Sequence, residues 1–322
     1  LNLNKIIVKS NFLLAAGLLA TSLFMTGCTS SVKETHQFEI GNKTFLIDKK
    51  PFVVKAAEIH YTRIPAEYWE HRIEMCKALG MNTICIYAFW NIHEQKPGVF
   101  DFEGQNNIAE FCRLAQKHGM YIILRPGPYV CSEWEMGGLP WWLLKKEDIA
   151  LRTSDPYFLE RTEIFMKRLG KELADQQITR GGNIIMVQVE NEYGGYAENK
   201  EYVAAVRDIV RNSGFNDVPL FQCDWSSNFQ LNGLDDLLWT INFGTGADID
   251  SQFEALRKAR PDSPLMCSEY WSGWFDHWGR KHETRPAETM VNGIKDMLDR
   301  NISFSLYMAH GGTTFGHWGG AN

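Results

Sequence analysis

Short apolar runs rich in β-branched residues alternate along most of this chain with longer segments whose apolar residues recur at helical spacing. The runs with the length and composition of buried strands are residues 53–59, 83–88, 121–125, 184–189, 220–223, 237–242, 265–268 and 304–308. The segments predicted to be helices are residues 65–79, 106–118, 156–174, 200–212, 251–259 and 286–300. Such alternation favours parallel strands joined by crossover helices, in either a (β/α)8 barrel or an open doubly wound sheet.

The barrel is the favoured fold. An open sheet of this kind usually carries a glycine-rich phosphate-binding loop after its first strand, and none follows residues 53–59. Several predicted helices also have clear ends: Pro156 follows Asp155 at a helix start, and Gly80 and Gly119 follow helix ends. The chain reaches Asn322 soon after the eighth strand. We therefore expect a (β/α)8 TIM barrel over residues 51–322, truncated after strand 8 and lacking its last helix.

Residues 1–28 have the pattern of an export signal. Two lysines precede an apolar run at residues 12–20 that is too short to span a bilayer, and Gly27-Cys28 follows. The Gly-Cys pair resembles a bacterial lipobox, in which Cys28 would be lipidated. We therefore expect an exported bacterial protein, periplasmic or anchored as an outer-membrane lipoprotein. Residues 29–50 are expected to form a polar tether and a small hairpin around residues 41–42.

Composition excludes several classes of function. The net charge of −6, the pI near 5.9 and the lack of a basic run argue against a nucleic-acid-binding surface. Of the seven cysteines, the six beyond Cys28 form no CxxC pair, which argues against a zinc site. Several lie in apolar runs, so we expect reduced core thiols. Neither a metal nor a cofactor is predicted. The eleven tryptophans suit flat sugar faces, although core packing explains any single one equally well.

Two glutamates close apolar runs at predicted strand ends, where barrel enzymes carry their chemistry. Glu192 follows the fourth strand and Glu269 the seventh. Glycoside hydrolysis uses such a pair: one carboxylic acid protonates the leaving oxygen, and the other faces the anomeric carbon. A lone glutamate is more often solvated or ion-paired, but the aromatic surroundings of both favour catalysis. We predict Glu192 as general acid/base, with a pKa raised toward about 6–7, and Glu269 as an ionised nucleophile hydrogen-bonded by a hydroxyl such as Tyr307.

Asn191 directly precedes the predicted acid. Its amide could hold a sugar hydroxyl next to the reacting carbon. Strict strand alternation would place Asn191 and Glu192 on opposite faces, so both reach one site only if the strand breaks or bulges there. The alternative is that Asn191 is a turn residue.

Longer motifs carry a family resemblance. Residues 125–129 (RPGPY), 131–140 (CSEWEMGGLP), 188–194 (QVENEYG) and 268–279 resemble glycoside hydrolase family 35, from about residue 54 to the end. That family consists mainly of β-galactosidases with a (β/α)8 catalytic barrel, which remove terminal non-reducing β-D-galactose with retention of configuration. The resemblance implies Glu192 as proton donor and Glu269 as nucleophile, in agreement with the roles argued from the residues alone.

Position by position, the resemblance also implies sugar contacts for Tyr87, Glu133, Asn191 and Tyr307. Core packing is the alternative for Tyr87, and an ion pair with Arg125 is the alternative for Glu133. A family tyrosine two residues after the nucleophile is replaced here by Trp271, which exchanges an O–H for an indole N–H in the substrate-binding site.

Three hypotheses follow. The first is a retaining exo-β-galactosidase that acts on terminal galactose of oligosaccharides or glycoconjugates, with carboxyls about 5–5.5 Å apart. The second is a related exo-glycosidase for another terminal sugar, motivated by Trp271. The third is a non-catalytic exported sugar-binding protein, motivated by the missing last helix. Because a binding protein gains little from a paired acid and nucleophile, Glu192 and Glu269 argue against the third.

Overall fold

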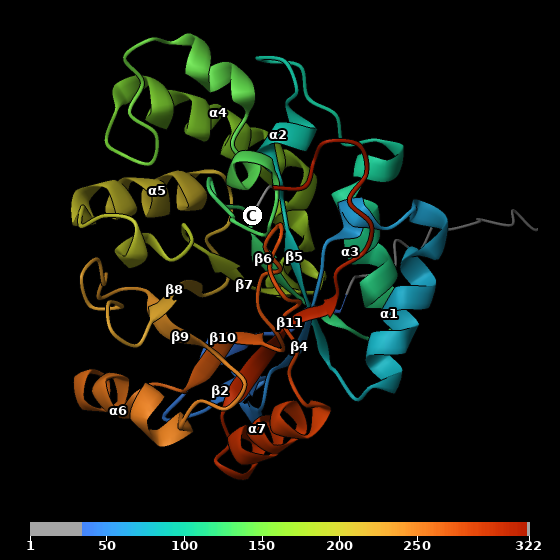
Figure 1. Cartoon of the computed structure of the whole chain (residues 1–322), viewed down its shortest axis with the longest axis vertical. Coiled ribbons are helices and arrows are strands. Elements are labelled where there is room, and N and C mark those ends of the chain that lie inside the picture. Colours follow the sequence, from blue (N-terminus) through green and yellow to red (C-terminus); the bar gives the residue numbers. More distant parts are fainter. Residues whose placement is uncertain (1–33, 321–322) are drawn as a thin grey trace, which may run out of the picture. The chain divides into compact units, whose positions relative to one another are not determined.

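The computed structural model describes residues 34–320, in which eight parallel strands close into a barrel (Figure 1). In chain order the barrel strands are β4 (Lys55–Ile59), β5 (Thr83–Tyr87), β6 (Tyr121–Arg125), β7 (Ile184–Gln188), β8 (Leu220–Trp225), β9 (Leu238–Gly244), β10 (Met266–Trp271) and β11 (Ser303–His310). Pairing of β11 with β4 completes the ring. Each predicted strand overlaps one of these, so the predicted (β/α)8 architecture is confirmed.

Helices lie outside the barrel, as the amphipathic segments predicted (Figure 1). They are α1 (Trp69–Ala78), the short α2 (Trp90–His93), α3 (Ile108–Lys117), α4 (Pro156–Leu173), α5 (Lys200–Asn212), α6 (Ile249–Ala259) and α7 (Ala287–Asp299). Asp155 caps α4 by accepting the N–H of Phe158 at 2.8 Å. Turns rather than a helix join β8 to β9.

The sequence predicted a hairpin of two strands, but the structure has three strands here. Strands β1 (Phe38–Ile40), β2 (Phe45–Ile47) and β3 (Lys50–Phe52) make a three-stranded antiparallel sheet. Asp48 and Lys49 both adopt positive φ, 49° and 66°, and this two-residue turn folds β3 back onto β2. Phe52 packs edge-on against Tyr121 at the start of β6, 5.4 Å between ring centroids. The small sheet therefore contacts the amino-terminal end of a barrel strand.

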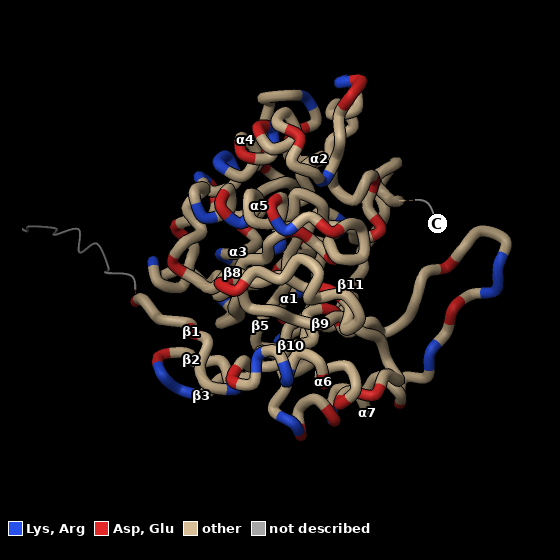
Figure 2. Tube along the Cα trace, turned by 90° about the vertical axis from the view of Figure 1, so that its left-hand side faces the viewer, with Lys and Arg blue, Asp and Glu red and all other residues tan. Residues whose placement is uncertain are grey.

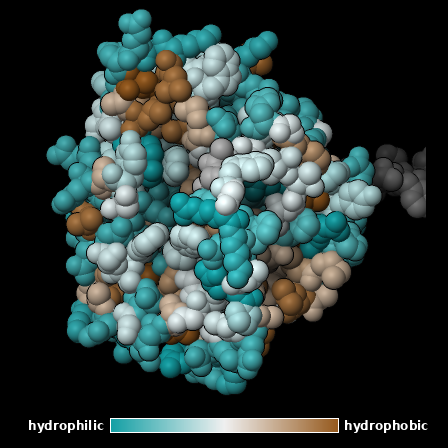
Figure 3. Space-filling model, viewed as in Figure 1, coloured by the Kyte–Doolittle hydropathy of each residue, from teal (hydrophilic) through white to brown (hydrophobic). Residues whose placement is uncertain are grey.

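The barrel strands are almost wholly buried, and β5 and β7 are buried at every position. The face shown in Figure 3 is largely hydrophilic, with a hydrophobic patch near α4. Charges of both signs are spread over the trace and over the projecting loop that leads into α7 (Figure 2). In residues 34–320 every cysteine is a free thiol and all but Cys131 are buried, which confirms the expected reduced core cysteines.

The predicted export signal and Cys28 lie outside the described residues. Within residues 34–320, no helix has both the length and the apolar character needed to cross a membrane.

Candidate active site

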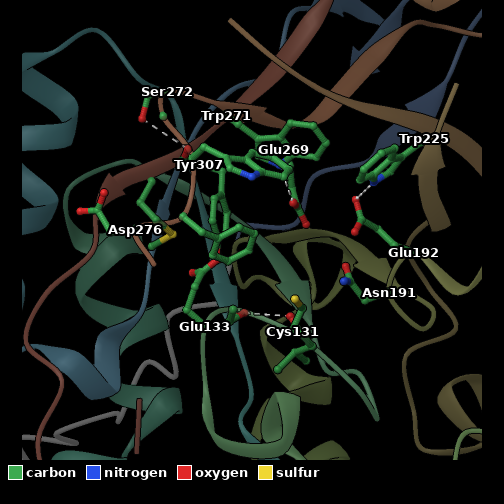
Figure 4. A pocket seen from close by; sticks show the side chains of 16 residues that line it. Cys131, Glu133, Asn191, Glu192, Trp225, Glu269, Trp271, Ser272, Asp276 and Tyr307 are labelled. Carbon is green, nitrogen blue, oxygen red and sulfur yellow. Dashed lines mark hydrogen bonds between the residues drawn. The ribbon is translucent and has the colours of Figure 1, made fainter. Parts of the chain in front are cut away.

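A cavity of about 600 Å³ opens at the carboxyl ends of the barrel strands. Its lining comes from the segments after β6, β7 and β10 and from the ends of β8, β10 and β11. It includes Glu133, Asn191, Glu192, Glu269, Trp271 and Tyr307. Six predicted site residues therefore line one space (Figure 4). Tyr87 does not line it.

The chain breaks out of strand geometry where the predicted acid begins. Strand β7 ends at Gln188, and Glu190 and Glu192 then adopt positive φ, 58° and 45°, on either side of Asn191. Left-handed backbone at alternate positions cancels the usual alternation of faces. Asn191 and Glu192 consequently both line the cavity, as the predicted break requires.

Arg152 holds this segment in place from a distant loop. Its guanidinium donates to both carboxylate oxygens of Glu190 at 2.7 and 3.2 Å, and to the carbonyl oxygen of Asn191 at 2.7 Å. Glu190 also accepts the O–H of Tyr202 and the backbone N–H of Asn191, both at 2.7 Å. Because Arg152 and Glu190 are buried, these charge-assisted bonds fix the backbone that carries Glu192.

The carboxylate of Glu192 lies between two donors that the sequence did not reveal. Its Oε1 accepts the indole N–H of Trp225 and the amide N–H of Asn242, each at 2.9 Å. Burial and the nearby charge of Glu269 raise the pKa of Glu192 to about 7, although both donors act in the opposite direction. At neutral pH the side chain is thus present in both its acidic and its basic form.

A bulge in β10 places the second glutamate. The pairing of β10 with β9 shifts between Cys267 and Glu269, so one residue is left out of the ladder. Ser268 then bonds Asn242 at 2.7 Å, while Glu269 lines the cavity and stays only 8% exposed. Figure 4 shows the carboxylates of Glu269 and Glu192 in the same part of the pocket.

Glu269 is hydrogen-bonded by a cation and an indole, and the hydroxyl expected for this role bonds another residue. Its Oε1 accepts from Arg125, and its Oε2 accepts the N–H of Trp271 at 3.0 Å. Tyr307 instead donates its O–H to Glu133 at 2.6 Å. A guanidinium binds a carboxylate more strongly than a hydroxyl does, so these contacts hold the carboxylate of Glu269 in place.

Below the cavity lies a charged cluster that was only partly anticipated. Tyr87 is fully buried and donates its O–H to Glu58, and Arg125 contacts both of them. Tyr87 thus lies outside the cavity lining, and Arg125 pairs with Glu58 and Glu269 rather than with Glu133. Glu58 lies inside an apolar strand segment, and a carboxylate at such a position needs a buried cationic partner.

The loop after β6 forms the part of the cavity wall that carries Glu133. Cys131, Ser132 and Glu133 all adopt positive φ, 59°, 63° and 46°, and Arg63 donates to the carbonyl oxygen of Glu133 at 2.7 Å. Burial raises the pKa of Glu133, and the bond from Tyr307 partly offsets that rise. The wall therefore presents a carboxylate and a phenol side by side, a pair suited to sugar hydroxyls.

Comparison with known proteins agrees with this geometry. The family model described as "Glycosyl hydrolases family 35" matches residues 44–322. This chain belongs to that family. This chain is 40% identical to a beta-galactosidase of Xanthomonas manihotis, over 96% of this chain and 52% of that protein. Mouse and human beta-galactosidases are 42% and 41% identical, each over 92% of this chain and 46% and 44% of their own lengths. The chain thus spans about half the length of the curated relatives it matches.

Solved structures support the fold alone, since they share little sequence. A beta-glucanase of Saccharophagus degradans aligns with a TM-score of 0.56 and 16% identity, over 87% of this chain and 86% of that one. The catalytic domain of an endoglucanase of Thermobifida fusca aligns with a TM-score of 0.53 and 13% identity, over 84% of each chain. The barrel of this chain therefore shares its architecture with the barrels of these two proteins.

Proposed function

We propose that this chain is the catalytic barrel of a retaining exo-β-galactosidase, which removes terminal β-D-galactose from oligosaccharides or glycoconjugates. One observation carries the proposal: Glu192, with a pKa of about 7, and Glu269, held by Arg125 and Trp271, line the same cavity. The beta-galactosidases named among the relatives support galactose as the sugar.

The first chemical step uses both carboxyls. The carboxylate of Glu269 attacks the anomeric carbon while the carboxylic acid of Glu192 gives its proton to the glycosidic oxygen. The bond between the anomeric carbon and that oxygen breaks, the alcohol leaves, and a covalent galactosyl ester forms on Glu269. Arg125 and Trp271 hold and orient the attacking carboxylate.

The second step reverses the role of Glu192. Esterification removes the negative charge of Glu269, which had helped to raise the pKa of Glu192. Glu192 therefore becomes a carboxylate and takes a proton from water, whose oxygen attacks the anomeric carbon. The ester bond breaks, galactose leaves with its β configuration retained, and both residues return to their starting states.

Sugar hydroxyls find partners where the loop after β6 meets the end of β11. Glu133 and Tyr307 present a carboxylate and a phenol there. The amide oxygen of Asn191 accepts from Arg125 and from Gln188, which orients its NH₂ group. An amide held in this way is suited to a hydroxyl beside the reacting carbon, where contacts strengthen in the transition state.

The side of the pocket nearest the acid suits a sugar leaving group. A second hollow of about 420 Å³ is bordered by Trp225 and Trp271, which also line the main cavity, and by Asn242, which bonds Glu192. Because the acid must face the departing oxygen, we place the leaving-group sugar over this hollow. Thr245 and Gln252 add polar atoms to it.

A panel of nitrophenyl β-glycosides tests the function. Galactoside should be hydrolysed faster than glucoside, glucosaminide or fucoside, and proton NMR should show β-galactose as the first product. Glu269→Ala should lose essentially all turnover, and unchanged activity in that variant contradicts the nucleophile assignment. Preference for another sugar favours the related exo-glycosidase, a proposal motivated by Trp271. Galactose binding by calorimetry without any hydrolysis favours the sugar-binding protein.

We further propose that the protein is exported from a bacterium and anchored through a lipid on Cys28. The basic, apolar and Gly27-Cys28 segments of residues 1–28 support this. Labelling of the expressed protein with a palmitate analogue should be lost in Cys28→Ser. Equal labelling of both proteins contradicts the anchor, and retention of both in the cytosol contradicts export.

A further inference from the structure

The two terminal nitrogens of the Arg125 guanidinium contact different sets of residues in the barrel. Its Nη1 lies below the cavity, where it contacts Glu58 Oε2 at 3.1 Å and the hydroxyl of Tyr87. Its Nη2 contacts Glu269 Oε1 and the amide oxygen of Asn191, two residues that line the cavity. One rigid, planar group therefore links a carboxylate outside the cavity to two residues of the proposed chemistry.

This arrangement is enclosed. Glu58 is 0% exposed and Arg125 is 1% exposed, so water does not screen the charges. The charged and titratable groups that act on Glu58 are Cys85 and Tyr87 from β5, Arg125 from β6, Cys267 and Glu269 from β10, and Tyr307 from β11. Arg125 is the cation among them, and Glu58 shares it with Glu269.

We propose that Glu58 is a positioning residue for the nucleophile: it anchors one arm of Arg125 so that the other arm stays on Glu269 and Asn191. The inference rests on the proposed function of Glu269. Glu58 lies outside the residues that line the cavity, so it acts through Arg125 and not on the sugar.

The physical reason is the geometry of the fork. A guanidinium with both arms engaged has no freedom to rotate, because its donors lie in one plane. Without the deep anchor, Arg125 would keep a single carboxylate partner and draw Glu269 toward itself and away from the anomeric carbon. A displacement of about 1 Å at a reacting group can cost on the order of 100-fold in rate.

Two substitutions separate anchoring from other effects. Glu58→Met removes both acceptor oxygens at similar length, whereas Glu58→Gln keeps one acceptor oxygen and removes the charge. Glu94→Met is the matched control, because Glu94 is also 0% exposed and pairs with Arg161 at 2.6 Å, but does not line the cavity. All three variants are compared with the native chain in thermal melts.

The decisive rate is covalent trapping of Glu269 by dinitrophenyl 2-deoxy-2-fluoro-β-galactoside, followed by intact mass. E58M should be trapped at least about 10-fold more slowly than the native chain. E58Q should stay within about 3-fold of native, and E94M within about 2-fold despite a lower melting temperature. Trapping of E58M at the native rate, or equal slowing of E58Q and E58M, overturns the proposal.

Two further measurements decide the remaining cases. If E58M does not fold, Tyr87→Phe removes the hydroxyl that contacts both Glu58 and Arg125; slower trapping supports the proposal and native trapping overturns it. If the native chain does not react with galactosyl reagents, the galactosidase function is refuted. The anchoring of Arg125 by Glu58 then remains testable by crystallography. In crystals of E58M, or of Tyr87→Phe in its place, Arg125 should lose its contact with Glu269 or with Asn191, and retention of both contacts overturns the proposal.

Discussion

Glu192 owes its chemistry to its surroundings more than to its residue type. Burial and the charge of Glu269 raise its pKa, while the N–H groups of Asn242 and Trp225 lower it by stabilising the carboxylate. The value of about 7 is the balance of these opposing contributions. Removing either donor should therefore change the pH at which Glu192 loses its proton.

Asn242→Ala should move the high-pH limit of activity upward. The general acid must be protonated, so kcat/KM falls as pH rises through the pKa of Glu192 in the free enzyme. Loss of the amide donor destabilises the carboxylate, which raises that pKa by about 0.5–1 unit. The pH profile of kcat/KM on a nitrophenyl galactoside measures this pKa. If the high-pH fall of kcat/KM stays at the native pH or moves to lower pH, the assignment is contradicted.

Position in the sequence predicted which glutamates lie together, but it did not predict their hydrogen-bond partners. Glu192 and Glu269 were identifiable because both end apolar runs, and barrel strand ends converge. Trp225 and Asn242 were missed, since their contacts depend on the turn after β7 and on the bulge in β10. Glu58 left a visible signal, a carboxylate within a buried strand, but its partner could not be found from spacing.

At the scale of elements, the segment after β7 shows what a loop needs in order to carry a catalytic group. Its backbone has two left-handed positions, which cost free energy for non-glycine residues. The buried pair of Arg152 and Glu190, together with the ring of Tyr129 stacked 4.0 Å from the guanidinium, offsets that cost.

Arg152→Lys should therefore damage both stability and turnover. Lysine offers one point charge where Glu190 and the carbonyl of Asn191 require a fork, so donors and acceptors are left unpaired in a buried site. We expect a loss of about 2–4 kcal/mol in the free energy of unfolding, measured by urea titration. The kcat should fall at temperatures where the variant is fully folded, because Glu192 shifts with the loop. A variant with native kcat contradicts this coupling.

The hollow beside Trp225 yields a prediction about leaving groups. Thr245→Trp fills it without touching either catalytic carboxyl. The kcat/KM for a galactosyl disaccharide should fall about 10-fold, because the leaving sugar loses its place. Galactosyl fluoride, whose leaving group is a single atom, should react at the native rate. Equal losses on both substrates, or none on the disaccharide, contradict the placement.

Elements were predictable because periodicity reports burial directly. All the barrel strands and the long helices follow from apolar spacing, with Asp155 and Pro156 marking one helix start. The third strand of the small sheet was missed because its turn uses Asp48 and Lys49 in left-handed geometry, without a glycine to signal it. The bulge in β10 also left no signal in the sequence, because a register shift depends on pairing with β9.

Three buried carboxyl groups lower the stability of the whole barrel at neutral pH. Burial is the main cause that raises the pKa of Glu58, Glu192 and Asp224 to about 7 each. In the unfolded chain such groups titrate near 4, so between about pH 4 and 7 the folded state binds more protons. Stability contributed by these groups is full below the unfolded pKa and is lost as pH rises through the folded pKa.

The melting temperature should consequently fall from pH 5 to pH 8, and Glu192→Gln should reduce the fall. A glutamine carries no charge in either state, so the variant loses the contribution of Glu192 to that slope, on the order of 2 kcal/mol. E192Q should melt close to native at pH 5 and above it at pH 8, while its activity is lost. Calorimetric scans at both pH values measure this, with Glu160→Gln as an exposed control. Parallel curves for native and E192Q proteins would mean that burial does not raise the pKa of Glu192, and the acid would then need another source of its proton affinity.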